Sequence, residues 1–337
     1  MSHATNFPTN MAIAATRSPK FAYTQGEITA KEAKALGVNM VLGPVLDVNN
    51  NRKNPIINFR SYSENQEVVS DFGSQFIKGI QDAGLLSAAK HYPGHGNTEV
   101  DSHNGLAIIE ADISEVEDVH LYPFKTSIEN GLEMVMVGHI AMTSLDPSNI
   151  PATHSKKIVE NILRNKWGFE GLIITDALEM GALGGLMPQS ESIVRAIEAG
   201  SDILLLPIDE LGAVNDIKRA VESGRLSEER INISVSRIFD YKEKLNLFSN
   251  RRIHDWAMVE AEVGKSDHYK FSLEVASKSI TAVKDVNKYL PLIPSEIDSI
   301  THLIISLDEN VDKQLKPFIR DVDRTHGHVR KIVVNNT

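Results

Sequence analysis

The sequence predicts an α/β fold built from repeated strand–helix units, as in a (β/α)8 barrel. Short apolar runs, typical of strands buried on both faces, alternate with amphipathic segments typical of helices. Polar side chains follow these strands directly, at Asp47, Lys90–His91, His139 and Asp176. In barrels of this kind the residues after the strands form the active site. About five units are predicted, whereas about eight close a barrel.

The order of elements follows from the apolar runs and the residues that interrupt them. Pro93, Gly94 and Gly96 are expected to end the second strand at Lys90–His91, because proline lacks a ladder donor and glycine permits sharp turns. The predicted strands are residues 38–42, 85–89, 132–137, 171–175 and 202–206, with a further strand at residues 301–307. The predicted helices are residues 24–36, 65–84, 114–130, 155–167, 190–200, 210–223, 227–245 and 268–279.

The composition is that of a globular protein. The chain has 337 residues, 42 % of them hydrophobic and 24 % charged. The net charge of −10 argues against a general binder of nucleic acid or anionic membranes, and no run of about 20 apolar residues predicts a membrane span. The chain has no cysteine, and its first residues lack the features of a signal peptide. A cytoplasmic or a periplasmic location both remain open.

The most informative stretch is residues 87–103, where Lys90, His91, His95, Asp101 and His103 gather at a strand end and the loop after it. A carboxylate two residues before an imidazole can bond one ring nitrogen and leave the other free for proton transfer. Asp101 and His103 are therefore a candidate acid/base pair. A metal site made of His91, His95, Asp101 and His103 is a second interpretation. A surface loop without chemistry is a third.

Asp176 is the second candidate catalytic residue. It ends the apolar run Leu172–Thr175, so a buried strand would hold its carboxylate at a strand mouth. A carboxylate placed in this way can attack an anomeric carbon, as the nucleophile of a retaining glycosidase does. The alternative is an aspartate that caps the following helix.

Lys90–Gly96 followed by Asp101–His103 resembles the signature KH(F/Y)PGHG…DSH of glycoside hydrolase family 3, and within it the β-N-acetylhexosaminidase branch. The resemblance covers about residues 7–337. Further segments follow in the family's order: Gly138–Ile140, Pro151–Thr153, Trp167–Phe169 and Ile174–Leu178.

The resemblance implies a retaining exo-β-N-acetylglucosaminidase that removes terminal GlcNAc from peptidoglycan fragments (muropeptides) or chitooligosaccharides, without a metal or organic cofactor. Asp176 matches the family's nucleophile, and His103, oriented by Asp101, matches its acid/base. Arg60, Lys90 and His91 match residues that bind the substrate in the family. Three further expectations concern single residues. Lys90 could instead form a buried ion pair with Asp47. His95 is expected to fix the loop, and His139 to line the pocket.

The resemblance also implies two domains, a catalytic barrel at residues 1–249 and, at residues 250–337, a linker with the start of an α/β sandwich. The charged segment at residues 251–267 is expected to be a loop-like linker. About three strand–helix units of the family's barrel are expected ahead of residue 1, so the chain is interpreted as truncated at both ends. The alternatives are a β-glucosidase or β-xylosidase, a GlcNAc phosphorylase of the same family, and an inactive remnant. The Asp101–His103 pair counts against the first of these.

Overall fold

The computed structural model describes residues 4–249, 256–306 and 315–335. The chain divides into two compact units, residues 1–280 and 281–337. The first unit therefore includes helices that lie beyond the predicted domain boundary at residue 249. That boundary concerns the family's domains and stays a prediction.

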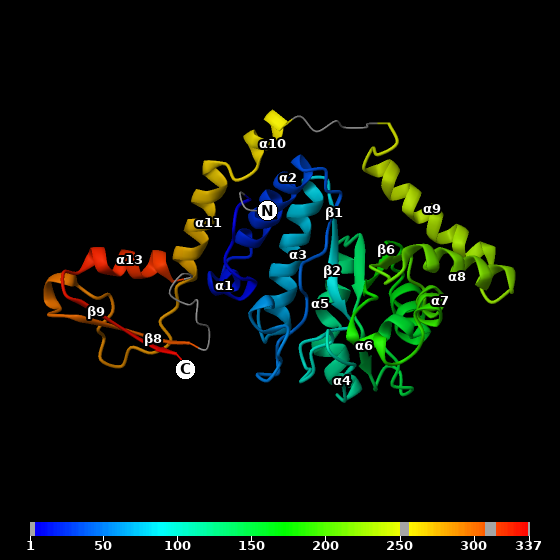
Figure 1. The fold of residues 1–337 in the computed structure, drawn as a ribbon, viewed down its shortest axis with the longest axis horizontal. Coiled ribbons are helices and arrows are strands. Elements are labelled where there is room, and N and C mark those ends of the chain that lie inside the picture. The colour runs from blue at the N-terminus through cyan, green and yellow to red at the C-terminus, as the bar shows by residue number, and fades with distance from the viewer. Residues whose placement is uncertain (1–3, 250–255, 307–314, 336–337) are drawn as a thin grey trace. The chain divides into compact units, whose positions relative to one another are not determined.

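A five-stranded parallel sheet organises the first unit (Figure 1). Its strands lie in chain order across the sheet, as in the wall of a barrel. They are β1 (Met40–Val41), β2 (Leu86–Tyr92), β4 (Met134–Val137), β6 (Leu172–Ala177) and β7 (Ile203–Leu205). The five strands and their parallel arrangement were predicted, and the sheet is open between β1 and β7 in the described residues.

Strand β2 is longer than predicted. It continues through Lys90 and His91 to Tyr92, so the expectation that it ends at Lys90–His91 was wrong. Partners on both sides keep this segment extended: Lys90 donates from its backbone to Pro44, and Gly138 donates to the carbonyl oxygen of Tyr92. The register with β4 shifts between Ala89 and Tyr92. The shift lies next to the candidate site, where such irregularities are common.

Helices follow the strands as expected, with one clear difference. The predicted helix 114–130 is divided into a short turn, a π-helical segment and a regular helix that begins next to Pro123. Proline at the first turn of a helix needs no hydrogen-bond partner for its nitrogen, so a new helix begins there. These segments are α4 (Ile113–Glu115), η2 (Val116–His120) and α5 (Tyr122–Glu129).

The remaining helices of the first unit are α1 (Asn10–Ala15), α2 (Lys20–Ala35), α3 (Gln66–Asp82), α6 (Gly181–Gly184), α7 (Gln189–Ala199), α8 (Glu210–Glu222), α9 (Glu228–Lys244), α10 (Trp256–Glu262) and α11 (Ser266–Ser279). The π-helical η4 (Lys157–Lys166) and the 3-10 turns η1 (Asn58–Arg60) and η3 (Ala152–His154) complete them. Helix α10 corrects the expectation of a loop-like linker at residues 251–267, of which residues 251–255 lie outside the described residues.

The core lies between the sheet and the helices packed on it. In α3, Val69, Phe72, Phe76 and Ile80 recur at helical spacing and are buried. Figure 1 shows α2 beside α3, and these helices touch closely because Gly79 has no side chain. A Cβ atom there would lie 2.1 Å from the carbonyl oxygen of Tyr23. Helix α3 also packs against β2.

A second, small parallel sheet was not predicted. It pairs β3 (Ala107–Ile109) with β5 (Ile140–Met142). Each of these strands follows the loop that leaves a strand of the main sheet, β2 and β4 respectively. The small sheet therefore ties together the two loops that carry Asp101–His103 and His139.

The second unit contains a parallel strand pair, β8 (Ile300–Ser306) and β9 (Val329–Asn335), with helix α13 (Lys316–Thr325) between them in sequence. The strand predicted at residues 301–307 corresponds to β8, and Leu307 lies outside the described residues. In neither unit does a described helix have the length and apolar character needed to cross a bilayer.

Candidate active site

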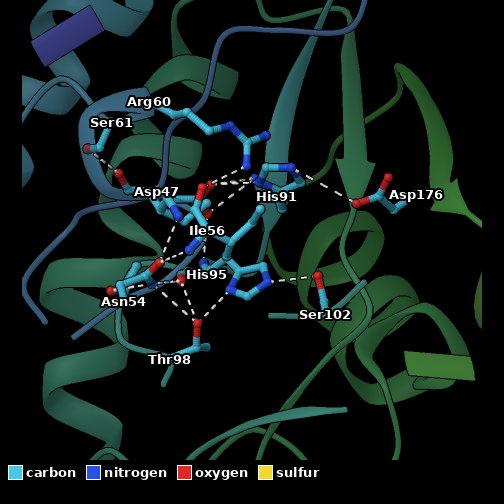
Figure 2. A network of polar contacts seen from close by, with 12 residues as sticks. Asp47, Asn54, Ile56, Arg60, Ser61, His91, His95, Thr98, Ser102 and Asp176 are labelled. Carbon is cyan, nitrogen blue, oxygen red and sulfur yellow. Dashed lines mark hydrogen bonds and ion pairs between the residues drawn. The ribbon is translucent and has the colours of Figure 1, made fainter. Parts of the chain in front are cut away.

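A buried carboxylate, Asp47, organises the strand end that carries the histidines (Figure 2). It is fully buried and accepts hydrogen bonds from Nδ1 of His91 at 2.7 Å and from the backbone nitrogen of His95 at 2.6 Å. Burial alone would raise the pKa of Asp47, but His91 and His95 together lower it below its ordinary value. Asp47 thus fixes the ring of His91 so that its Nε2 faces Asp176.

Asp176 lies at the mouth of β6. Its Oδ2 atom is 4.0 Å from Nε2 of His91, and its Oδ1 atom accepts from the backbone nitrogen of Ala177 at 2.9 Å. Burial alone would raise the pKa of Asp176, but His91 and the Ala177 amide lower it. The carboxylate is therefore ionised at neutral pH. The capping alternative was wrong, because the N-cap of the following helix α6 is Met180.

Asp101 and His103 form the predicted pair. Oδ1 of Asp101 accepts from the backbone nitrogen of His103 at 2.9 Å and lies 2.7 Å from its Nδ1. Burial would raise the pKa of Asp101, but the hydrogen bonds from His103 lower it. Within the described residues Nε2 of His103 has no hydrogen-bond partner. The ring is thus oriented at one nitrogen and open to solvent at the other.

The loop that carries this pair is attached to the chain just after Asp176. The backbone nitrogens of Gly181 and Ala182 donate to the carbonyl oxygens of His103 and Ser102, both at 3.1 Å. The approach is close: a Cβ atom at Gly181 would lie 2.5 Å from the carbonyl oxygen of His103. Two candidate catalytic groups from distant parts of the sequence are therefore connected by main-chain hydrogen bonds.

Arg60 and Lys90 line one cavity of about 270 Å³ together with Thr9, Asn10, Val45 and Phe59. Burial and the neighbouring Arg60 lower the pKa of Lys90. Nη1 of Arg60 donates to the carbonyl oxygen of Ile56 at 3.0 Å, which fixes part of the guanidinium. In the described residues Asp47 is bonded to His91 and His95 and forms no ion pair with Lys90. The described residues therefore do not support the alternative in which Lys90 forms a buried ion pair with Asp47.

Residues 1–241 match the family model of the glycosyl hydrolase family 3 N-terminal domain. The chain belongs to glycosyl hydrolase family 3. The match confirms the resemblance that the motif around residues 90–103 indicated. It also agrees with an α/β fold built on parallel strands.

The relatives bear hexosaminidase and glucosidase names. The chain is 36 % identical over 331 residues to beta-hexosaminidase A of Pseudoalteromonas piscicida, covering 90 % of this chain and 53 % of the relative. It is 31 % identical to a beta-N-acetylglucosaminidase/beta-glucosidase of Cellulomonas fimi, covering 86 % of this chain and 53 % of the relative. The chain thus spans about half the length of these curated relatives.

Two solved structures have a similar fold. The beta-N-acetylglucosaminidase of Paenibacillus sp. str. FPU-7 matches with a TM-score of 0.87 and 30 % identity, over 99 % of this chain and 64 % of that one. A beta-glucoside phosphorylase bound to 2FGlc matches with a TM-score of 0.92 and 28 % identity, over 98 % of this chain and 62 % of that one.

In this family 3 chain the four residues of the metal alternative do not form one cluster. Both ring nitrogens of His95 are engaged, by Thr98 and Ser102, and Nδ1 of His91 faces Asp47. Across residues 4–249, 256–306 and 315–335, no group of three or more His, Cys, Asp or Glu side chains is arranged to hold a metal ion. The donor geometry does not favour that alternative.

Sequence reasoning missed Asn54, which joins two parts of the site (Figure 2). Its Nδ2 atom donates to the carbonyl oxygens of His95 and Gly96 at 2.7 and 3.0 Å. Its Oδ1 atom accepts from the backbone nitrogens of Ile56 and Ile57 at 3.0 and 2.7 Å. Asn54 thereby connects the segment before Arg60 to the histidine loop. An asparagine in an irregular stretch gives no signal for so remote a partner.

Proposed function

We propose that this chain carries the catalytic residues of a retaining exo-β-N-acetylglucosaminidase that releases terminal β-linked GlcNAc from muropeptides or chitooligosaccharides. The observation that carries the proposal is the Asp101–His103 pair, hydrogen-bonded through the loop backbone to the chain that follows Asp176. An ionised carboxylate and an oriented imidazole together supply a nucleophile and a proton carrier. The hexosaminidase names of the relatives support this substrate class.

In the first step of the proposed reaction, a carboxylate oxygen of Asp176 forms a bond to the anomeric carbon of the sugar. The bond between that carbon and the aglycone oxygen breaks, and the oxygen takes the proton from Nε2 of His103. Asp101 stabilises the imidazole in the orientation that this transfer requires. The product is a glycosyl ester on Asp176.

In the second step, a water oxygen attacks the same carbon and gives its proton to Nε2 of His103. The ester bond breaks, GlcNAc leaves with its original configuration, and Asp176 is again a carboxylate. Arg60, Lys90 and His91 are proposed to bind sugar hydroxyls, because two of them line the cavity and His91 faces Asp176. No metal or organic cofactor takes part in the proposed steps.

The proposed domain architecture follows the family. The sheet of the first unit is proposed to be part of a (β/α)8 barrel, with residues 1–249 as the barrel region. Residues 250–337 are proposed as a linker and the start of an α/β sandwich. The parallel β8–α13–β9 arrangement supports the second assignment, since parallel strands joined through a helix are the unit of such sheets.

The central test is hydrolysis of 4-nitrophenyl β-N-acetylglucosaminide, with 4-nitrophenyl β-glucoside as comparator. The Asp176→Asn variant is expected to lose at least about 10³-fold in kcat, because the amide cannot attack. The matched control is Glu179→Gln, which neutralises an exposed carboxylate close by and should retain activity. Full activity of Asp176→Asn would remove the mechanism, and preference for the glucoside would favour the glucosidase alternative.

The covalent step has its own test in His103→Ala. The 4-nitrophenolate leaves without much acid assistance, whereas the attack by water still lacks its base. A burst of 4-nitrophenolate and an ester of GlcNAc on the peptide containing Asp176 are therefore expected, the ester seen by mass spectrometry after rapid quenching. A steady release of product without the ester would contradict the two-step mechanism.

A phosphorylase is the second candidate. An imidazole in place of a second carboxylate removes one anion from the site, so phosphate could accept the sugar. A structural neighbour of this chain is a beta-glucoside phosphorylase. The discriminating measurement is phosphorus NMR of the reaction in phosphate buffer, in which a sugar 1-phosphate would indicate phosphorolysis. A folded wild-type chain without turnover in either assay would favour the inactive remnant.

A further inference from the structure

The peptide bond between Ala177 and Leu178, one residue beyond Asp176, lies where the main sheet loses its regular hydrogen bonds. The ladder between β4 and β6 ends at Val137 and Thr175. The next nitrogen on the β4 side, that of Gly138, donates to Tyr92 on β2. The nitrogen of Met180 in the following turn donates to the carbonyl oxygen of Ala177 at 3.1 Å, but this oxygen receives no backbone donor from β4.

The imidazole of His139 supplies that donor. Its Nε2 atom lies 2.9 Å from the carbonyl oxygen of Ala177, and the side chain is fully buried. On the opposite side, the nitrogen of Leu178 donates to the carbonyl oxygen of Leu205 on β7 at 2.9 Å. The carbonyl of Ala177 and the nitrogen of Leu178 belong to one planar peptide group. That plane is thus held from both neighbouring strands.

The partners of His139 define which ring nitrogen carries the proton. A carbonyl oxygen only accepts, so Nε2 must donate to Ala177. Burial lowers the pKa of His139, and the ring is therefore neutral with Nδ1 as an acceptor. Nδ1 lies 2.7 Å from Oγ1 of Thr153 in η3, a shorter contact than those of the same hydroxyl with the carbonyl oxygens of Gly138 (3.1 Å) and Val137 (3.5 Å), so its single proton is assigned to Nδ1. Thr153 selects the tautomer that can hold Ala177.

We propose that His139 is a positioning residue for Asp176, an inference that rests on the function proposed above. By fixing the Ala177–Leu178 peptide, His139 restricts the backbone of Ala177, whose nitrogen donates to Oδ1 of Asp176. The carboxylate is thereby held in one orientation toward the anomeric carbon. His139 touches neither the substrate nor the reacting atoms in this role.

The kinetic test compares His139→Phe, which keeps a ring without a donor, with His139→Gln, whose amide can replace Nε2. We expect His139→Phe to lower kcat by about 10- to 100-fold with little change in KM, because a misplaced nucleophile slows the chemical step. His139→Gln should restore most of kcat. The matched control is His268→Phe, which removes a buried imidazole bonded to Glu32 on α2. An unchanged kcat in His139→Phe would overturn the proposal.

A second readout does not depend on turnover. Carbon NMR of the Asp176 carboxyl, assigned by Asp176→Asn, should show a higher pKa in His139→Phe than in the wild type or His139→Gln. Nitrogen NMR of the wild-type ring should show a proton on Nε2 only. If the wild type does not hydrolyse the GlcNAc substrate, the proposed function is wrong, but the titration of Asp176 still tests the positioning role of His139. An unchanged pKa of Asp176 in His139→Phe would refute that role.

Discussion

Two histidine–carboxylate pairs lie in this site, and their surroundings are opposite. In the first, His91 and Asp47, the side chains are 7 % and 0 % exposed, and Asp47 also accepts from His95. In the second, His103 and Asp101, they are 57 % and 26 % exposed. The Nδ1–carboxylate distance is 2.7 Å in both pairs.

The same contact therefore serves two purposes, and its surroundings decide which. A buried carboxylate with several donors cannot move or exchange protons with solvent at low cost, so it is suited to hold a ring in place. An exposed pair contributes little to stability but leaves one ring nitrogen accessible. We infer that Asp47 and His91 form the fixed part of the site and Asp101 and His103 the proton-transferring part.

The largest expected effect is on the free energy of unfolding, and it should differ between the carboxylates of Asp47 and Asp101. Asp47→Ala should lower the free energy of unfolding by about 3–5 kcal/mol, because it leaves buried donors of His91 and His95 without an acceptor. Asp101→Ala should change it by less than about 1 kcal/mol, as for other exposed pairs. Urea denaturation measures both, and similar losses in the two variants would break the comparison.

For catalytic activity, the exposed carboxylate Asp101 should matter strongly even though it contributes little to stability. Asp101→Asn is expected to lower kcat for the GlcNAc substrate by about 10²- to 10⁴-fold, because the amide no longer stabilises the imidazolium or fixes its tautomer. Its unfolding curve should superimpose on that of the wild type. A stable variant with wild-type kcat would show that Asp101 does not assist His103.

Asn54 and Lys53 allow a comparison between adjacent residues that bridge the same two segments. Asn54 is buried and bonded to the histidine loop, whereas Lys53 forms an exposed ion pair with Glu99 at 3.3 Å. Asn54→Ala should lower the free energy of unfolding by about 2 kcal/mol. Lys53→Ala should change it by less than about 0.5 kcal/mol. Chemical denaturation of both variants tests this, and equal effects would contradict it.

The pH dependence of stability should report the buried part of the site. Burial lowers the pKa of His95 from its ordinary 6.5 to about 4. Between these values the unfolded chain binds a proton that the folded chain does not, so stability falls as the pH decreases from about 6.5 to 4. His95→Gln should make this dependence shallower by about 1.4 kcal/mol per pH unit. Urea denaturation between these pH values checks it, and an unchanged slope would argue against a neutral, buried His95.

Sequence reasoning located the strands and the residues at their ends because continuous apolar runs mark buried strands. Asp176 lies near the end of β6 as expected, whereas β2 continues one residue past His91. The Asp101–His103 contact was also predictable, since the two residues are separated by one position and meet locally. Their catalytic roles remain proposals.

The contacts that hold the site could not be predicted in the same way. Asp47 meets His91 across 44 positions, and Asn54 meets Gly96 across 42. Such pairs depend on how β2 and the loop after it lie against residues 43–54, which no local pattern defines. The extension of β2 through His91 has the same origin, because it depends on the partners Pro44 and Gly138 rather than on the propensity of the segment.

The attachment of the His103 loop by main-chain atoms has a consequence for protein engineering. Since Gly181 and Ala182 bond to carbonyl oxygens of the loop, side chains nearby can be exchanged while the attachment remains. Exposed Val100 and Asn104 are therefore suitable positions for libraries that alter the preferred leaving group. Gly181 itself should be left unchanged, because any side chain there would displace His103.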